Sequence, residues 1–313
     1  MRTVLVTGGA GFIGSHIVGR LIESGMQVRV LDDLSSGKRT NLAPWLADID
    51  FREGSVCSEA DCRDAVTGVD TIFHQAAIAS VPRSVAEPER THEVNLNGSL
   101  RLLVAARDAG VRRVVFASSS AIYGDDPVQP KREEMMPCPI SPYGLHKLTV
   151  EYYLRMFHRL YGLETVALRY FNVFGPRQDP KSEYAAVIPK FITRMLQNQA
   201  PTVFGDGRQT RDFIYVGEVA RANMLAAEAP DAPGRIINIA GGRQIDLLDL
   251  IATINDVLKT RIRPVMAAPQ PGDVRDSSAD ITMAEKCIGF VPEVDVVAGL
   301  HRTIDWYREN LRG

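Results

Sequence analysis

The sequence lacks the features that mark several large classes of protein. It has only four cysteines in 313 residues and no C-x-x-C pair, so we expect no metal site. We expect the four, Cys57, Cys62, Cys138 and Cys287, to be reduced thiols. Repeats and low-complexity segments are absent from the sequence as well.

Long runs of one chemical kind are also missing. The formal net charge is −2 and no basic run occurs, so we expect no nucleic-acid partner. No apolar stretch is long enough to span a membrane, so we expect no membrane partner. A strand pattern already starts near Thr3, which predicts no signal peptide and a cytoplasmic location.

What the sequence does contain is the composition of a globular protein, with 45% hydrophobic and 24% charged residues. Up to about Tyr170, short apolar runs alternate with helical patterns, which predicts an α/β fold with a doubly wound parallel sheet of the Rossmann type. The expected strands are 4–6, 28–31, 51–52, 71–73, 114–117 and 165–168, and the expected helices are 11–24, 60–66, 91–109 and 142–161.

The stretch TVLVTGGAGFIG at the N-terminus is the most informative. Gly8, Gly11 and Gly14 follow a short apolar strand and open a helical pattern. Such glycines let a pyrophosphate approach the helix N-terminus, whose free N–H groups favour negative charge. A second strand pattern ends in Asp32, where an acidic residue would hold a ribose diol. These residues predict a dinucleotide site.

The chain beyond Tyr170 is more often interrupted by proline and has shorter helical segments, at 216–228, 247–258 and 296–311. We therefore expect residues 1–170 to form a dinucleotide-binding domain and residues 171–313 to form mainly a smaller substrate-binding lobe. Segments at about 216–240 are expected to return to the sheet.

A candidate acid–base group lies in the second half of the first domain. Tyr143 and Lys147 are one turn apart on an expected helix, and a lysine ammonium lowers the pKa of a neighbouring phenol. Ser118, Ser119 and Ser120 follow an expected strand and supply hydroxyls that can bind a substrate oxygen. Y-x-x-x-K alone is common by chance; its combination with the glycine loop makes it informative.

These motifs together resemble the extended short-chain dehydrogenases/reductases that act on nucleotide sugars. The resemblance rests on TGGAGFIG at Thr7–Gly14, SSSAIYG at Ser118–Gly124 and SPYGLHK at Ser141–Lys147. It continues through RYFNVFGPRQDP from Arg169 and GDGRQTRDFIYV from Gly205. Within this family the chain looks most like UDP-hexose 4-epimerases, especially those for UDP-N-acetylglucosamine.

The resemblance implies a mechanism and a cofactor. Tyr143 would remove the O4 proton while bound NAD takes the C4 hydride. The 4-keto sugar would then rotate in the site, and the hydride would return to its other face. Ser119 takes the catalytic Ser/Thr position, and Lys147 also holds the nicotinamide ribose. The implied NAD contacts are Gly8, Gly11, Phe12, Ile13, Gly14, Asp32, Asp33, Ser55, Val56, Gln75, Ala76, Ala77, Asn95, Tyr143 and Lys147.

The resemblance also implies where the UDP-sugar binds. Asn172 and Arg211 match diphosphate contacts, with Arg243 as a further candidate, and Val203 would lie along the uracil. The remaining implied substrate contacts are Ser80, Ser118, Ser119, Ser120, Tyr143, Gln178, Ala186, Asp273 and Ser277. Ser277 occupies the position that gates the hexose pocket, and a small residue there admits a 2-acetamido group. The family also implies a homodimer through the helices at 91–109 and 142–161.

Two departures from the family pattern matter. Ser55 stands where relatives usually carry an Asp that contacts adenine. Gln270 stands where many relatives carry a second diphosphate-binding Arg, a role that Arg275 or Arg243 would share.

Ser120-Ala121 replaces the Asp-Glu pair of sister dehydratases, which removes their acid and base. A UDP-glucuronate 4-epimerase and a non-catalytic NAD-binding regulator remain as alternatives, although the former group usually has Thr in place of Asn172.

Overall fold

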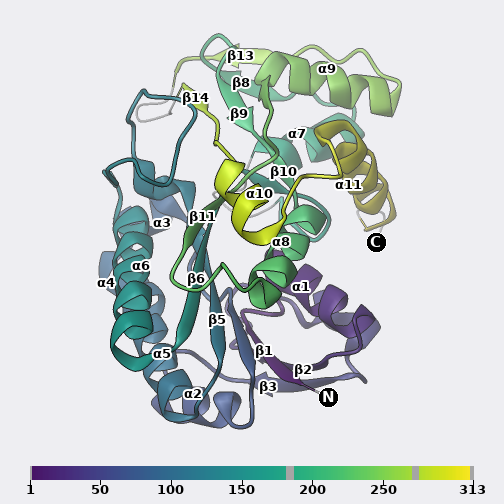
Figure 1. Ribbon diagram of the computed structural model, residues 1–313. Helices are drawn as coiled ribbons and strands as arrows, with labels where there is room; N and C mark the ends of the chain where they lie inside the picture. The colour runs from purple at the N-terminus through teal and green to yellow at the C-terminus, as the bar shows by residue number, and fades with distance from the viewer. Residues whose placement is uncertain (1, 181–186, 270–274, 311–313) are drawn as a thin grey trace.

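The computed structural model describes residues 2–180, 187–269 and 275–310. Its centre is a seven-stranded parallel sheet with strand order β11-β6-β5-β4-β1-β2-β3. The bounds of the strands are β1 Thr3–Thr7, β2 Gln27–Asp32, β3 Ile49–Glu53, β4 Thr71–His74, β5 Arg113–Ser119, β6 Glu164–Tyr170 and β11 Ile236–Ile239. This architecture confirms the predicted Rossmann-type α/β fold (Figure 1).

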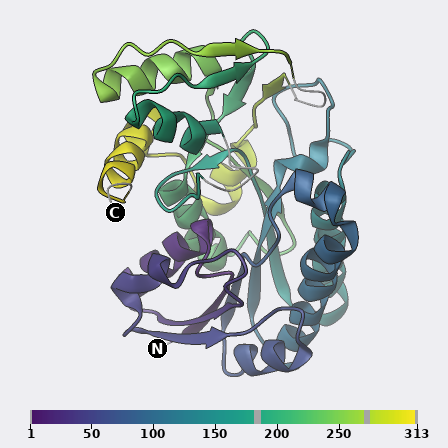
Figure 2. The same cartoon turned by 180° about the vertical axis from the view of Figure 1, so that it is seen from behind.

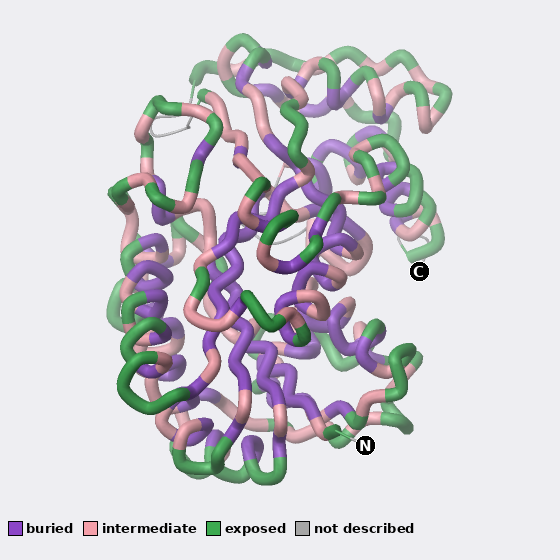
Figure 3. Tube along the Cα trace, in the orientation of Figure 1, coloured by how far each residue is buried: buried purple, intermediate pink, exposed green. Residues whose placement is uncertain are grey.

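The strands form where the sequence has continuous apolar runs, because both faces of the sheet are covered by helices. Helices α2 (Glu59–Val66), α5 (Gly98–Asp108) and α6 (Pro142–Tyr161) cover one face. Helices α1 (Phe12–Glu23) and α8 (Val216–Glu228) pack together on the other face. Figure 3 shows the inner strands as the most continuously buried part of the chain.

A stretch expected to be one helix, at 91–109, is divided. It consists of α4 (Pro88–His92), a π-helical turn η2 (Glu93–Asn97) and α5. Within that turn the Asn95 amide bonds both backbone groups of Ile78, accepting from N at 2.8 Å and donating to O at 3.1 Å. The chain is thus helical throughout most of the predicted range, and the π-helical turn within it was not predicted, because a periodic sequence pattern does not report where the hydrogen-bond register widens.

The C-terminal half contributes to both parts of the molecule. Strand β11 pairs in parallel with β6 and forms the edge of the main sheet, with Asn238 opposite Arg169. The remaining helices and strands form a smaller lobe beyond the carboxyl ends of the sheet strands (Figures 1 and 2). Its helices and strands include β7 (Val173–Phe174), α7 (Val187–Leu196), β8 (Thr202–Phe204), β9 (Thr210–Asp212), β10 (Ile214–Tyr215), β12 (Gln244–Asp246), α9 (Leu247–Leu258), β13 (Val265–Ala267), β14 (Asp276–Ser277) and α11 (Val296–Asn310).

Shorter segments complete the described chain. They are η1 (Arg39–Trp45), α3 (Val81–Ala86), η3 (Ser120–Tyr123) and α10 (Thr282–Ile288). Within the described ranges no helix is both long and apolar enough to cross a membrane. Among the same residues, no cluster of three or more His, Cys, Asp or Glu side chains is placed to hold a metal ion.

Candidate active site

A cleft of about 780 Å³ lies at the carboxyl ends of the parallel strands, where this type of sheet binds its ligands. The loop between β1 and α1 forms one wall, and α6 contributes Tyr143 and Lys147. Most residues predicted to hold the cofactor lie along it: Gly8, Gly11, Phe12, Ile13, Gly14, Asp32, Asp33, Ser55, Val56, Gln75, Ala76 and Ala77. Ser80, Ser118 and Gln178 line it too.

The loop between β1 and α1 can follow its tight path only because Gly8 and Gly14 lack side chains. A Cβ on Gly14 would stand 2.1 Å from the backbone oxygen of Gly8, and a Cβ on Gly8 would stand 2.7 Å from the backbone nitrogen of Ala76. Gly8 also has φ of +68°, which favours glycine. The backbone can therefore approach a ligand closely at the start of α1.

Asp32 is fixed where a ribose would lie. Its Oδ2 accepts the N–H of Ala10 and its Oδ1 the N–H of Leu34, both at 2.9 Å. Burial raises the pKa of this carboxyl, and the two backbone N–H groups act in the opposite direction. Asp33 accepts the Ser55 hydroxyl at 3.3 Å, so these neighbouring residues are linked at the same end of the cleft. Carboxylates at this place can accept the hydroxyl groups of a ribose, which fits a dinucleotide.

The acid–base residues lie at the inner end of the cleft. Ser141 caps α6 by accepting the N–H of Gly144, and Pro142 occupies the first turn, so Tyr143 and Lys147 lie on successive turns. The Lys147 ammonium donates to the backbone oxygen of Ala117 at 2.7 Å and lies 5.7 Å from the centroid of the Tyr143 ring. The two groups predicted to cooperate are thus brought together.

Burial changes the protonation of both groups. It lowers the pKa of Lys147 to about 7, with the Glu151 carboxylate acting in the opposite direction. Burial also raises the pKa of Tyr143, while a hydrogen bond with the Ser119 hydroxyl lowers it. The phenol therefore needs a nearby positive charge to ionise at neutral pH. Ser119 itself accepts the N–H of Ala121 at 3.1 Å, at the start of η3, and Ser120 is half-buried beside it.

Three predicted contacts have other roles in the structure. The Ser118 hydroxyl is buried and donates to Glu151 at 2.5 Å, so its proton is held by that carboxylate. Asn95 is 2% exposed and its amide is bound to both backbone groups of Ile78, so it positions the loop after β4. The Val203 side chain is fully buried in the core of the small lobe, which leaves only its backbone for a uracil.

Three predicted diphosphate and sugar contacts, Asn172, Arg211 and Ser277, lie together. The Asn172 amide donates to the backbone oxygen of Asp212 at 3.0 Å and to the Ser277 hydroxyl at 3.4 Å. Ser277 on β14 pairs with Arg211 on β9. Arg243 is exposed in the turn before β12. Ala186 and Asp273 lie outside the described residues.

Some cleft residues were not predicted as contacts. Arg177 donates to the Ser15 hydroxyl at 3.3 Å and lies over the Trp45 ring, which puts a cation close to the start of α1. Lys38 and Asp179 also line the cleft and form an ion pair at 2.8 Å. Arg177 and Asp179 belong to a motif quoted for the resemblance, but their places depend on the turn after β7.

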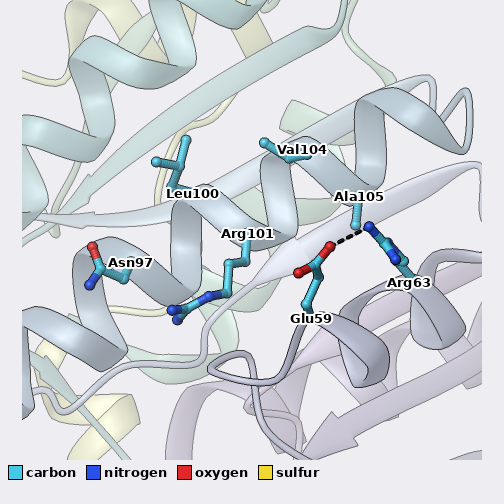
Figure 4. A pocket seen from close by; sticks show the side chains of 7 residues that line it. All are labelled: Glu59, Arg63, Asn97, Leu100, Arg101, Val104 and Ala105. Atoms are coloured by element: carbon cyan, nitrogen blue, oxygen red, sulfur yellow. Dashed lines mark hydrogen bonds and ion pairs between the residues drawn. The ribbon is translucent and has the colours of Figure 1, made fainter.

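A second pocket, of about 490 Å³, lies between α2 and α5, away from the glycine loop (Figure 4). Both of its arginines are in ion pairs, Arg63 with Glu59 and Arg101 with Glu93. None of the predicted site residues lines it. The first cleft is therefore the candidate active site.

Comparison with known proteins identifies the family. The model of the NAD dependent epimerase/dehydratase family matches residues 4–240. The chain belongs to this family. A putative UDP-glucose 4-epimerase of Methanocaldococcus jannaschii is 40% identical across 99% of both chains. The predicted resemblance is thereby confirmed, and NAD is the cofactor.

Solved structures agree with this assignment. The UDP-N-acetylglucosamine 4-epimerase from Methanobrevibacter ruminantium M1, in complex with UDP-N-acetylmuramic acid, matches with a TM-score of 0.94 at 44% identity, over 98% of each chain. The UDP-glucose 4-epimerase from Thermotoga maritima matches with a TM-score of 0.94 at 42% identity, over 99% of each chain. The chain is an NAD-dependent nucleotide-sugar 4-epimerase, and the alternative of a non-catalytic regulator is set aside.

Proposed function

We propose that this epimerase interconverts UDP-N-acetylglucosamine and UDP-N-acetylgalactosamine, and that it also accepts UDP-glucose and UDP-galactose. The observation that carries the proposal is the small side chain of Ser277, which lies against Asn172 and beside Arg211. A serine leaves space for an acetamido group where a larger side chain would fill it. Gln178 supports a polar ligand, because its buried Oε1 lines the cleft without a partner among the described residues.

We propose that Tyr143 acts as the base that takes the O4 proton of the sugar, with Ser119 holding that oxygen. A bound NAD would supply reversible hydride transfer at C4, so that the hydride can return to the opposite face of the sugar. Lys147 stabilises the Tyr143 phenolate, since its ammonium lies one helical turn away. Asp32 binds the adenosine ribose. Asn172 and Arg211 hold the diphosphate and let the hexose turn.

The substrate is tested by incubating the purified protein with UDP-glucose, UDP-N-acetylglucosamine, UDP-glucuronate and UDP-xylose and separating the products. We expect turnover of the acetylated sugar to be at least as fast as that of UDP-glucose. Turnover of UDP-glucuronate alone would instead support the alternative substrate. A relative from Thermodesulfobacterium geofontis, 31% identical over 99% of this chain, is named a UDP-glucuronate 4-epimerase.

A change at Ser277 tests the pocket directly. Ser277→Tyr should lower kcat/KM for the two acetylated sugars roughly 30-fold, because overpacking costs about 2 kcal/mol, and should spare the non-acetylated pair. Ser277→Ala is the matched control, since it removes the hydroxyl without adding bulk. Equal losses for both substrate classes, or no loss for either, would show that Ser277 is not the gate.

We also propose that the protein forms a homodimer through α5 and α6. Helix α6 exposes large apolar side chains in the single chain, among them Leu145 (53% exposed), Tyr152 (51%) and Met156 (46%). Leu100 and Val104 on α5 line the pocket of Figure 4 and are partly exposed. Light scattering should give twice the chain mass of 34.5 kDa, and Met156→Asp with Tyr152→Asp should give the monomer mass.

A further inference from the structure

Behind Tyr143 and Lys147 lies a buried ion pair that the proposed mechanism does not use. Glu151 on α6 and Arg169 on β6 have side chains that are 0% and 2% exposed. Arg169 donates to both carboxylate oxygens, from Nη2 at 2.7 Å and from Nε at 2.9 Å. Such bidentate pairs are among the strongest hydrogen-bonded contacts. No solvent reaches this pair, so its charges act on their buried neighbours with little screening.

Helix periodicity places Glu151 in line with the acid–base residues. Tyr143, Lys147 and Glu151 follow one another at intervals of four residues, so they form one stripe along α6. The Glu151 carboxylate is thus one turn from the Lys147 ammonium, as Lys147 is one turn from the phenol. A phenol, a cation and an anion therefore follow one another along the helix.

The same carboxylate also holds the strand that carries the serines. The Ser118 hydroxyl donates to Glu151 Oε1 at 2.5 Å, and Ser118 lies opposite Arg169 in the β5–β6 register. One residue earlier, the oxygen of Ala117 accepts from Lys147 at 2.7 Å. Glu151 therefore fixes the end of β5 against α6 at the point where Ser119 enters the site.

Other ionisable groups surround this stripe. Helix α6 adds His146, and β4 adds His74, whose pKa burial lowers to about 3, so His74 is neutral in the working range. On the far side, Arg169 donates to the hydroxyl of Tyr123 at 2.8 Å, and the Glu133 carboxylate lies near it. Of the charged groups that act on Lys147, Glu151 is the one that favours the ammonium.

We propose that Glu151 is a positioning residue for the epimerase reaction, which supplies the counter-charge that keeps Lys147 protonated and holds the serine strand in register. Arg169 fixes the carboxylate in this geometry. The inference rests on the proposed roles of Tyr143 and Lys147.

The primary test is an NMR titration of the Lys147 ammonium in the chain without substrate, with the signal assigned by its loss in Lys147→Met. Glu151→Gln should lower the pKa of Lys147 by roughly one to two units, because two unit charges a helical turn apart interact by that order at an effective dielectric constant of about 20. Glu151→Asp keeps the charge but shortens the side chain, and should leave the titration close to that of the unchanged protein. Glu164→Gln is the matched control, since it breaks an ion pair with Arg113 at the opposite end of the same two strands.

The kinetic test uses a UDP-sugar that the unchanged protein turns over. Glu151→Gln should lower kcat about tenfold at and above neutral pH with little change in KM, because Glu151 is buried behind Lys147. The difference in kcat between Glu151→Gln and the unchanged protein should become smaller as the pH falls, because Lys147 of the variant is protonated at lower pH. If the unchanged protein turned over none of these UDP-sugars, the proposed function would be contradicted. The NMR titration would still test the role of Glu151 in that case.

A second variant keeps the test decisive if Glu151→Gln folds poorly. Glu151→Gln removes the carboxylate that balances the buried charge of Arg169, and such a loss destabilises a protein. The double variant Glu151→Gln with Arg169→Met removes both charges and should show the same lowered Lys147 titration. The proposal is overturned if Lys147 titrates as in the unchanged protein in Glu151→Gln or in the double variant, or if Glu151→Asp shifts it as far as Glu151→Gln.

Discussion

Tyr143→Phe should reduce kcat by about 10²–10⁴-fold, the usual contribution of a positioned acid or base. The substitution removes only the hydroxyl oxygen; the ring and the backbone N–H, which donates to the Ser84 hydroxyl at 3.0 Å, stay in place. Cofactor affinity and thermal stability should therefore change little. Steady-state turnover of UDP-N-acetylglucosamine or UDP-glucose, with NAD affinity measured in parallel, checks this result.

The matched control for that variant is Tyr161→Phe, which removes a hydroxyl from the exposed last residue of the same helix. It should keep the turnover of the unchanged protein. A Tyr143→Phe variant with near-normal kcat would exclude Tyr143 as the base and would move the search to the other hydroxyls near η3.

Lys147→Met should lower kcat roughly 100-fold just below neutral pH. A charge 5.7 Å from the Tyr143 ring centroid stabilises the phenolate by about 3 kcal/mol at an effective dielectric constant of about 20. That energy corresponds to roughly two units in the pKa of Tyr143. The loss should be read as kcat at saturating NAD, so that weaker cofactor binding does not contribute.

The sign of the pH dependence separates this explanation from simple damage. The pKa of Lys147 is about 7, so its ammonium helps the phenol below that pH and is lost as the pH rises above it. The ratio of kcat of the unchanged protein to kcat of Lys147→Met should therefore become smaller at alkaline pH. There the Tyr143 phenol of the variant also ionises more easily. Lys190→Met, which removes an exposed lysine of α7, is the control and should keep the kcat of the unchanged protein at each pH. A ratio that stays constant with pH would contradict the proposed role of Lys147.

The sequence predicted the parts of the structure that repeat a local pattern. The six expected strands lie within or overlap β1 to β6, because a buried parallel strand needs a continuous apolar run. Gly8, Asp32 and Tyr143 could be placed at the cleft because each stands next to the end of such a strand or at a helix start. Strands of two or three residues, such as β7, β10 and β14, carry no pattern of their own and were not predicted.

What the sequence did not predict is the protein partner that each buried polar group takes. Ser118 and Asn95 were interpreted as ligand contacts, yet one hydroxyl binds Glu151 and one amide binds Ile78. Glu151 is 33 positions from Ser118 in the chain, so no local signal connects them. Val203 was placed by its match to a motif, whereas its burial depends on how the helices of the small lobe pack around it.

The position of β11 at the edge of the main sheet bears on how the chain folds while it is synthesised. β11 is made roughly 70 residues after the end of β6, which takes about 3–14 s at the usual rates of translation. During that interval the outer backbone groups of β6 are open to pairing with another strand, and such edges promote aggregation. We therefore expect the nascent chain to be most prone to aggregate through β6 until Ile236–Ile239 is made and pairs with that edge.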